Sequence, residues 1–514
     1  MEQSTSHPPA IELVGINKSF GPVVANKDIN LSASRGSIHG VIGENGAGKS
    51  TLMSILYGFY HADSGIIRVN GEQITIPDSQ AAIAAGIGMV HQHFMLVENF
   101  TVLENVVLGV EGGMMLAEGL AAARERLAYL AKEYALDIDP DALISDLPVG
   151  LQQRVEILKA LYRKAEILIL DEPTGVLTPA EADHLFRILA QLRDQGKTIL
   201  LITHKLREIM AITDEVSVMR RGEMVATVKT SGTSVEALAE LMVGRSVLLE
   251  VEKDNTKPGD ILLSVRNLSV RDERGVTLVD DVSFEVRAGE IVGIAGVSGN
   301  GQSELLEALS GTRDMTAGGF EINGKFFGVV EDPDANDLRH NGLAYVPEDR
   351  HRMGLVTKFD ARENIILGYH DDPEYLNGPF INYDAVLAQT EKAIDEFDVR
   401  PPNPHLNAAK FSGGNQQKLV LAREIMRDPD VLLVGQPTRG VDIGAIEFIH
   451  KRLIQMRDEG KAVLLVSVEL DEVRSLSDRI LVMCGGKIIG ERDGNANEQE
   501  IGLMMAGIDG EDAA

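Results

Sequence analysis

The sequence is short of cysteine. Its 514 residues include one, Cys484. A single thiol excludes a disulfide within the chain and a metal site built from cysteines. It also fits a reducing compartment, in which free thiols persist.

Positive charge is scarce as well. The chain has 49 Lys and Arg residues against 78 Asp and Glu residues, which gives a formal net charge of −29 at pH 7. Proteins that bind nucleic-acid backbones cluster Lys and Arg on one surface, so this balance argues against a nucleic-acid partner. An acidic surface of this kind mostly serves solubility.

Long apolar runs and a targeting segment are also missing. No uncharged apolar run approaches the roughly 18 residues that are needed to span a bilayer. The first ten residues, MEQSTSHPPA, have neither a basic start nor an apolar core, so we expect no secretory signal. Any role at a membrane therefore requires partner subunits that span it.

What the sequence does contain is an internal repeat. The segment GENGAGKS (43–50) aligns with GVSGNGQS (296–303), and ILILDEPTGV (167–176) aligns with VLLVGQPTRG (431–440). A repeat with a long period fixes the architecture before any motif is interpreted. The two copies predict two domains of the same fold.

The length of the chain supports the same division, because a single core rarely grows beyond roughly 250 to 300 residues. The stretch between the copies is charged and contains Pro and Gly, as linkers do. We predict a first domain over residues 1–247, a linker over 248–260 and a second domain over 261–514.

Each copy alternates strand-like and helix-like segments. DINLSA (28–33) alternates like a half-buried strand, whereas ILIL (167–170) and TILLIT (198–203) are continuous β-favouring runs, typical of a parallel sheet covered on both faces. Leucines recur at helical spacing from Leu120 to Leu130, which predicts a helical insert. These patterns predict an α/β fold.

The first copy contains a phosphate-binding loop. Its G-x-x-x-x-G-K-S pattern follows an apolar strand and precedes a helical run, which is the context that this motif requires. Backbone amides of the loop would face phosphate oxygens, Lys49 would reach the β- and γ-phosphates, and Ser50 would bind Mg²⁺. The nucleotide-binding residues predicted here are Gly43, Asn45, Gly46, Gly48, Lys49, Ser50 and Thr51.

Further polar residues follow the neighbouring strands. Asp171 and Glu172 end ILILDE at the sheet edge where nucleotides bind, so Asp171 would hold the magnesium and Glu172 would orient or activate the attacking water. His204 would donate to the γ-phosphate, Gln92 would sense or bind the magnesium, and Phe20 would stack on adenine. Each has an ordinary alternative, as a turn cap, a structural histidine or a core aromatic. It is the ordered set that favours a nucleotide site.

This ordered set resembles the ATP-binding-cassette (ABC) ATPases, and the resemblance covers almost the whole chain. It implies two tandem P-loop NTPase domains, each with a mainly parallel core sheet, an antiparallel β subdomain and a helical insert. It also implies ATP hydrolysis, with ATP and Mg²⁺ as cofactors. In that family a signature segment, typically Leu-Ser-Gly-Gly-Gln, begins a helix that closes on ATP held by the opposite domain.

FSGGNQQKLVLARE (411–424) resembles this signature, with an asparagine inserted at position 415. The residues that the resemblance assigns to ATP binding are Ser412, Gly413, Gly414 and Gln416. The first copy reads LPVGLQQ at the same place, so a proline stands for the serine and a valine for the first glycine. Because proline has neither a hydroxyl nor an N–H, this signature should be poor.

The second copy has lost complementary residues. Gln302 stands where the first copy has Lys49, Gly435 and Gln436 where it has Asp171 and Glu172, Glu348 where it has Gln92, and Val468 where it has His204. In the head-to-tail sandwich of the family, one composite site combines the intact loop and acids of the first copy with the intact signature of the second. We therefore predict one hydrolytic site per chain.

FSGGNQQK and VPEDRHRMGL (346–355) most resemble ATPase subunits of bacterial importers for simple sugars and nucleosides. Residues 91–106 and 147–161 resemble the nucleoside branch more than the ribose or galactose branch. The resemblance implies two transmembrane permease subunits as partners, a solute-binding protein acting indirectly, and a peripheral position at the cytoplasmic face of the bacterial inner (plasma) membrane.

Two other functions are possible for tandem cassettes. One is a soluble ATPase that acts on ribosomes, for which a long charged linker, basic surfaces and two intact sites would be expected. The sequence has none of the three. The other is a regulatory nucleotide-binding protein without transport, which the intact catalytic set of the first copy fits poorly.

Overall fold

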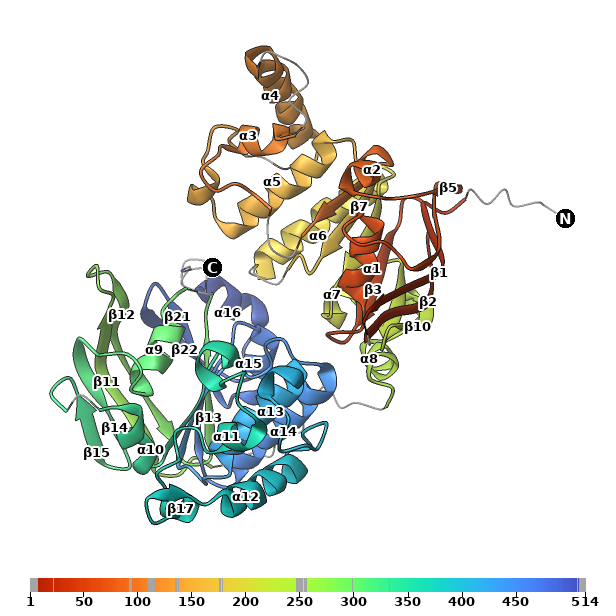
Figure 1. Ribbon diagram of the computed structural model, residues 1–514. Helices are drawn as coiled ribbons and strands as arrows, with labels where there is room; N and C mark the ends of the chain where they lie inside the picture. The colour runs from red at the N-terminus through yellow and green to blue at the C-terminus, as the bar shows by residue number, and fades with distance from the viewer. Residues whose placement is uncertain are drawn as a thin grey trace. The chain divides into compact units, whose positions relative to one another are not determined.

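The computed structural model describes residues 8–21, 23–91, 95–109, 116–134, 136, 138–174, 177, 179–245, 253, 257–297, 299–331, 333–505 and 507. The chain divides into two compact units, Met1–Val247 (unit 1) and Leu248–Ala514 (unit 2). Figure 1 shows that each unit combines sheets with helices.

The core of unit 1 is a six-stranded sheet in the order β10-β9-β3-β8-β7-β6. All neighbouring pairs are parallel except β9 and β10. The strands are β3 (Ile38–Gly43), β6 (Ile87–Val90), β7 (Ile167–Asp171), β8 (Thr198–Ile202), β9 (Glu215–Arg220) and β10 (Glu223–Lys229). Every residue of β3, β7 and β8 is buried, as their continuous apolar runs predict for a sheet covered on both faces.

A second, antiparallel sheet of unit 1 has the order β2-β1-β4-β5. Its strands are β1 (Ile11–Phe20), β2 (Val23–Ala33), β4 (Ser64–Val69) and β5 (Glu72–Ile74). Exposed and buried residues alternate in the second half of β2, as the DINLSA pattern predicts. This sheet is the antiparallel β subdomain that the family resemblance implies.

Three helices form the predicted insert of unit 1. They are α3 (Val102–Val107), α4 (Leu116–Glu133) and α5 (Val149–Tyr162), which contact one another and lie together in Figure 1. Leu127 and Leu130 are buried on α4, which confirms the helical spacing. The other helices are α1 (Lys49–Leu56), α2 (Ser79–Ala84), α6 (Pro179–Asp194), α7 (Leu206–Ile212) and α8 (Val235–Val243).

Unit 2 repeats the topology. Its main sheet has the order β16-β19-β20-β13-β21-β22 and its antiparallel sheet the order β12-β11-β14-β15. The strands are β11 (Ile261–Arg271), β12 (Thr277–Arg287), β13 (Glu290–Ala295), β14 (Ala317–Ile322), β15 (Lys325–Gly328), β16 (Leu343–Val346), β19 (Val431–Gly435), β20 (Ala462–Val466), β21 (Arg479–Cys484) and β22 (Lys487–Asp493), with a small pair β17 (Leu376–Asn377) and β18 (Phe380–Ile381). The sequence repeat is therefore a structural repeat.

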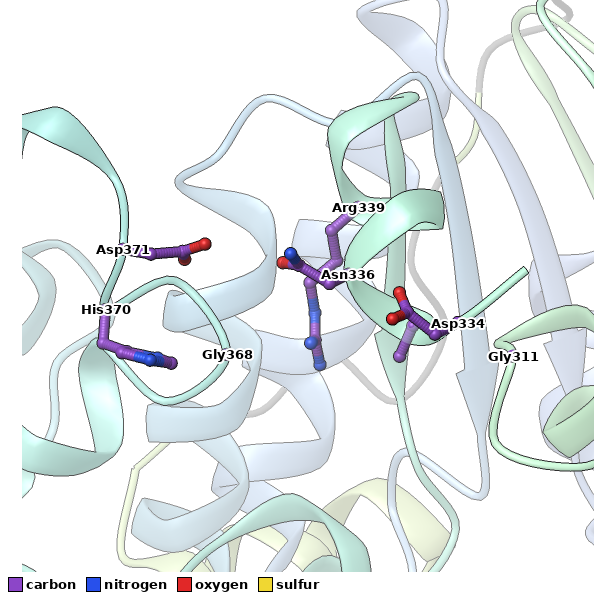
Figure 2. A pocket seen from close by; sticks show the side chains of 8 residues that line it. Gly311, Asp334, Asn336, Arg339, Gly368, His370 and Asp371 are labelled. Atoms are coloured by element: carbon purple, nitrogen blue, oxygen red, sulfur yellow. The ribbon is translucent and has the colours of Figure 1, made fainter. Parts of the chain in front are cut away.

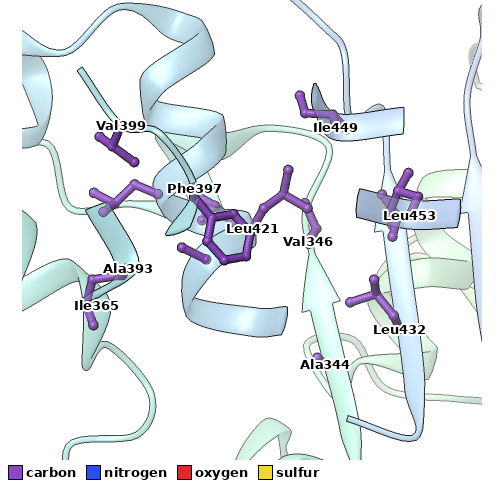
Figure 3. Packing of buried hydrophobic residues seen from close by; sticks show 14 of the residues in the cluster. Ala344, Val346, Ile365, Ala393, Phe397, Val399, Leu421, Leu432, Ile449 and Leu453 are labelled. Atoms are coloured by element: carbon purple, nitrogen blue, oxygen red, sulfur yellow. The ribbon is translucent and has the colours of Figure 1, made fainter. Parts of the chain in front are cut away.

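The helices of unit 2 are α9 (Gln302–Leu309), α10 (Ala335–His340), α11 (Ala361–Ile365), α12 (Tyr383–Glu396), α13 (Gly413–Ile425), α14 (Ile443–Asp458), α15 (Leu470–Leu476) and α16 (Glu498–Met505). The core under the signature segment joins α13 to strand β16 and to helices α11 and α12 (Figure 3). Phe397, at the end of α12, lies beside Leu421 of α13, and Val346 of β16 is part of the same cluster. The middle of α13 is thus packed against the sheet on one side and against α12 on the other.

Among the residues that the structure describes, no helix combines the length and the apolarity that crossing a bilayer requires.

Candidate active site

The predicted phosphate loop connects β3 to α1 in unit 1. Gly46 and Gly48 have φ angles of 80° and 99°, in the left-handed region that glycine adopts readily. A Cβ on Gly48 would overlap the Ala25 carbonyl oxygen, and a Cβ on Gly43 would overlap the Met219 carbonyl oxygen. Gly48 is also the N-cap of α1 and brings no side chain to the first-turn amides, which suits an anion at that position.

Lys49 lies folded over its own loop. Its Nζ donates to the carbonyl oxygens of Gly43 at 2.7 Å and Glu44 at 3.1 Å, and the residue is 6% exposed. Burial lowers the pKa of Lys49, while the charges of Glu172, Asp171 and Glu44 act in the opposite direction. The ammonium is therefore held at the loop by two backbone carbonyl oxygens, and the charges of the nearby acids favour its protonated form.

Asp171 and Ser50 form the candidate magnesium site. Asp171 ends β7 and is 8% exposed, and the Ser50 hydroxyl, in the first turn of α1, donates a hydrogen bond to it. Burial and the charge of Glu172 raise the pKa of Asp171, against this hydrogen bond and the charge of Lys49. A buried carboxylate and a hydroxyl beside a phosphate loop are the hard oxygen donors that Mg²⁺ prefers.

The size of this donor set also fits magnesium. It consists of one carboxylate, Asp171, and one hydroxyl, Ser50. Magnesium in nucleotide sites takes one or two protein oxygens and completes its shell with phosphate oxygens and water. The residues present therefore fit Mg²⁺ bound together with a nucleotide.

Glu172 and His204 form a hydrogen-bonded pair at the ends of β7 and β8. His204 Nδ1 lies 2.8 Å from Glu172 Oε1, so this nitrogen carries the proton that it donates to the carboxylate. Burial would raise the pKa of Glu172, but the hydrogen bond and the charges of His204, Lys49 and Lys205 outweigh it and lower the pKa. Glu172 is thus an ionised acceptor for a water proton at neutral pH.

The structure brings five of the predicted residues together: Lys49, Ser50, Asp171, Glu172 and His204. Asn45 is exposed in the loop and Thr51 is half-buried in the first turn of α1. Gln92 lies outside the described residues.

Phe20 ends β1 on the antiparallel sheet and is 43% exposed, which excludes the core-aromatic alternative. Its ring makes an edge contact with Tyr60, with 5.1 Å between the ring centroids. Lys18 Nζ lies over the ring, 5.4 Å from its centroid, so stacking on adenine stays a prediction for Phe20.

Sequence reasoning missed Asn26. This residue is fully buried on β2, and its Nδ2 donates to the Gly48 carbonyl oxygen at 3.1 Å, which ties the antiparallel sheet to the phosphate loop. The signal available in the sequence was an asparagine at a position where the strand faces the core.

The signature segment begins α13 in unit 2. Ser412 is the N-cap, and its hydroxyl accepts hydrogen bonds from the backbone N–H of Asn415 at 3.4 Å and from its Nδ2 at 2.7 Å. A Cβ on Gly413 would lie 2.6 Å from the Gly440 carbonyl oxygen. The inserted asparagine thus supports the cap, and the first glycine is required for packing within unit 2.

The predicted ATP-binding residue Gln416 is held inside unit 2. It is 5% exposed, and its Nε2 donates to the Ala408 carbonyl oxygen at 2.9 Å. Its Oε1 accepts from Arg350 Nε at 3.3 Å and lies 2.8 Å from His351 Nε2. In this structure the glutamine therefore fixes the start of α13.

Arg350 gives the PEDR segment a physical role that the sequence did not reveal. Its Nη1 donates to the Arg439 carbonyl oxygen at 2.6 Å and its Nη2 to that of Gly440 at 3.4 Å. With the contact to Gln416, the guanidinium joins the end of β16, the start of α13 and the loop after β19. We call these contacts the Arg350 bracket.

The aligned segment of unit 1 differs as predicted. Pro148 is the N-cap of α5 and makes no side-chain capping hydrogen bond. Gln152 donates to the Leu147 carbonyl oxygen at 2.9 Å, so the fold of the turn is kept while the serine hydroxyl is lost.

Unit 2 also has a pocket, shown in Figure 2, in which Asp371 points toward Asn336 on α10. Its lining residues are Gly311, Asp334, Ala335, Asn336, Arg339, Gly368, His370 and Asp371. None of them belongs to the predicted nucleotide sites.

The model of a known family, described as ABC transporter, matches residues 26–175 and 279–439. Three relatives match almost end to end. The nucleoside import ATP-binding protein NupA of Lactococcus lactis subsp. cremoris is 47% identical over 97% of this chain and 98% of its own length. The guanosine import ATP-binding protein NupO of Bacillus subtilis is 47% identical over 97% of each chain. The glucose import ATP-binding protein TsgD13 of Haloferax volcanii is 45% identical over 97% of this chain and 96% of its own.

The matched regions cover the phosphate loop, the strand-end acids and the signature segment, in the order in which the structure places them. The chain therefore belongs to the ABC transporter family, as a tandem-cassette ATP-hydrolysing subunit.

Proposed function

We propose that the chain hydrolyses ATP at one site, which is built on unit 1 and completed by the signature segment of unit 2. The observation that carries this proposal is the Glu172–His204 pair beside Lys49 and Asp171. At the aligned positions unit 2 has an amide and an alkyl side chain, Gln436 and Val468. Neither can take a proton from water.

The residues of unit 1 would have different roles in ATP binding and hydrolysis. Loop amides, together with Gly43, Gly46 and Gly48, would cradle the phosphates, and Lys49 would bind the β- and γ-phosphate oxygens. The attacking water would give its proton to Glu172, which His204 holds in place. Mg²⁺, when bound by Ser50 and Asp171, would neutralise charge on the β- and γ-phosphates, and Gln92 stays a predicted further ligand. Asn45 and Thr51 would bind phosphate from either side of Lys49, and Phe20 would stack on the base.

The signature segment would supply the remaining contacts. Ser412 offers a hydroxyl, Gly413 and Gly414 keep the helix start free of bulk, and the first-turn amides of α13 suit a γ-phosphate. Gln416 would act by holding this turn in shape. Closing on ATP and reopening after hydrolysis would give a two-state cycle.

We further propose that this cycle drives nucleoside import through two transmembrane permease subunits at the cytoplasmic face of the membrane. A separate solute-binding protein would deliver the solute. Two of the relatives at 47% identity are named for nucleoside and guanosine import, and the glucose relative at 45% marks a simple sugar as the second candidate. These import names favour transport over action on ribosomes.

The one-site proposal is tested by a matched pair of variants in the full-length chain. Glu172→Gln should lower steady-state ATP turnover by about 10²-fold or more, because it removes the positioned base. Gln436→Ala, at the aligned position of unit 2, should leave turnover unchanged. Substantial turnover in Glu172→Gln would show that hydrolysis does not depend on this carboxylate.

The solute proposal needs a different assay. The solute-binding protein of the same importer is titrated with nucleosides and with ribose, galactose and glucose by calorimetry. Nucleoside binding is expected, and strong sugar binding without nucleoside binding would contradict the nucleoside assignment while leaving the ATPase proposal intact.

A further inference from the structure

A buried carboxyl group of unit 1, Glu208, joins the loop after β7 to the loop after β8. Glu208 lies in the first turn of α7 and is 8% exposed. Its Oε1 accepts a hydrogen bond from the Thr174 hydroxyl, and its Oε2 accepts one from the Thr203 hydroxyl at 3.2 Å. We call these two contacts the Glu208 bridge.

The two threonines stand next to the Glu172–His204 pair. Thr174 follows Glu172 by two residues, and Thr203 directly precedes His204. The hydrogen bond of the pair, 2.8 Å between His204 Nδ1 and Glu172 Oε1, would lengthen if either loop shifted. The Glu208 bridge thus fixes the distance between the two backbone segments from which the base and its partner project.

The loop after β7 has a backbone conformation that needs such support. Glu172 has a φ angle of 48°, in the left-handed region that a glutamate adopts only at a cost in free energy. Its backbone N–H donates to the Ile202 carbonyl oxygen at 2.8 Å, and Gln153 Nε2 on α5 donates to the Pro173 carbonyl oxygen at 2.6 Å. Since the bridge holds the next residue, three consecutive residues are each tied to a different element.

The bridge is closed to solvent. Thr174 is 4% exposed and Thr203 is 1% exposed, so water does not readily replace either hydroxyl. Burial raises the pKa of Glu208, against the two threonine hydrogen bonds and the charges of Lys205 and His204. A carboxyl group in either ionisation state can bind both hydroxyls, because a hydroxyl both donates and accepts.

Unit 2 keeps the acid but uses it differently. Glu472 stands at the position that aligns with Glu208. Its Oε1 lies 3.0 Å from His450 Nε2 on α14, and its Oε2 is buried and has no hydrogen-bond partner in the described part of the unit. The bridge therefore accompanies the unit with the base, and not the unit that has Gln436 and Val468 in place of the pair.

The turn after the strand is capped in the same way in both units. Thr203 Oγ1 accepts from the backbone N–H of Lys205 at 3.0 Å, and Ser467 Oγ accepts from that of Glu469 at 3.1 Å. The two hydroxyls share this capping contact, and Thr203 adds the contact to Glu208. Ser467 is therefore a matched control for Thr203.

We propose that Glu208 is a positioning residue for ATP hydrolysis, which holds Glu172 within hydrogen-bond distance of His204 by bridging the loops that carry them. This inference rests on the hydrolytic site proposed for unit 1. In this role Glu208 contacts no nucleotide and takes no proton from water. Its effect on turnover passes through the Glu172–His204 pair.

The first test separates the hydrogen bonds of Glu208 from its charge. Glu208→Ala in the full-length chain should lower kcat by about 10- to 100-fold, because small misplacements of a reacting group cost that much, and should leave the KM of ATP nearly unchanged. Glu208→Gln should restore most of the turnover, since the amide oxygen accepts from one hydroxyl and the amide N–H donates to the other. Equal losses in the two variants would overturn the proposal.

Near-isosteric variants guard against a folding defect, with thermal unfolding measured alongside turnover. Thr174→Val and Thr203→Val each remove one hydroxyl of the bridge while keeping the shape of the side chain, and each should lower kcat severalfold. Ser467→Ala removes the capping hydroxyl of unit 2 and should leave turnover unchanged. The same kcat in Thr203→Val and Ser467→Ala would contradict the bridge.

A double variant shows whether Glu208 acts through the pair. His204→Ala removes the partner of Glu172 directly, so adding Glu208→Ala to it should lower kcat little further. Losses that multiply would indicate a separate structural effect and overturn the proposal. Glu172→Gln checks the site itself: if it abolishes turnover while Glu208→Ala does not lower it, the positioning role fails and the hydrolytic site stands. Turnover that survives Glu172→Gln would refute the site.

Discussion

We predict that Arg350→Ala lowers ATP turnover, although Arg350 touches no nucleotide in the proposed mechanism. Arg350→Ala removes three donor contacts, to the carbonyl oxygens of Arg439 and Gly440 and to the Gln416 side chain. A hydrogen bond from a charged group contributes about 1.5–3 kcal/mol when it is removed without replacement. Here the two carbonyl contacts are exposed, so water replaces part of them, and we expect a net loss of about 1.5–3 kcal/mol for the whole bracket.

That free energy holds the start of α13 in place. If the signature segment must be fixed for hydrolysis, the loss appears in turnover, and about 1.4 kcal/mol corresponds to each factor of ten. The expected fall in kcat is therefore on the order of 10- to 100-fold. The Kd of ATP at unit 1 should change little, because the loop, Asp171 and Glu172 are intact.

The assay is steady-state ATP turnover of the full-length chain, with ATP binding measured separately and thermal unfolding as a check on folding. Arg352→Ala is the matched control, since it removes an exposed arginine two residues further along the same turn. Arg350→Lys keeps the charge but loses the fork of donors, and an intermediate rate is expected. Equal rates in Arg350→Ala and Arg352→Ala would refute the reasoning.

Three other variants test the site and its support. His204→Gln removes the imidazole hydrogen bond and the charge that lower the pKa of Glu172, so the acidic limb of the turnover–pH profile should move to higher pH. In the unmodified chain, the lowered pKa of Glu172 stabilises the fold above the ordinary pKa of 4.5. This stabilisation is lost as the pH falls below that value. If the acidic limb of the profile does not move, the Glu172–His204 hydrogen bond does not control the catalytic carboxylate. Gly48→Ala should weaken ATP binding and lower the unfolding temperature of unit 1, because the Cβ meets the Ala25 carbonyl oxygen at a positive φ; retained ATP affinity in calorimetry would contradict this. Phe397→Ala should destabilise unit 2 by about 3–5 kcal/mol in denaturant unfolding, and Phe380→Ala, an exposed aromatic of the same unit, should change stability little.

The site of unit 1 was largely predictable from the sequence because its signals are local. The loop glycines, Lys49 and Ser50 lie within eight consecutive residues, and Asp171 and Glu172 end an apolar run whose burial the composition already predicts. Parallel strands bring their carboxyl ends to one edge of the sheet. Residues that follow neighbouring strands therefore lie close together. The fold class followed from the same alternation of segments.

Contacts between distant segments were not predictable in this way. Arg350 lies 66 residues from Gln416 and 89 from Arg439, and no periodicity connects them. Asn26 of the antiparallel sheet reaches Gly48 in the phosphate loop, 22 residues further along the chain. In each case the side chain makes hydrogen bonds to a backbone that only the folded unit brings within reach.

Glu348 shows how an aligned sequence can mislead. In the alignment of the two copies, unit 2 has a glycine in place of Asp171 and a glutamate in place of Gln92. These look like two separate defects. In three dimensions the ends of β16 and β19 are neighbours, because the two strands pair in parallel. A glutamate after one strand then reaches the space left by a glycine at the end of the other.

The same reasoning explains why Gly435, Glu348 and Gln302 occur together in unit 2. An aspartate at 435 and Glu348 cannot occupy one space, and two carboxylates there without Lys49 would leave a buried site with excess negative charge, which is costly to desolvate. Gln436 stands at the position of Glu172, so the acid that could act as a base has been replaced in the same set of changes.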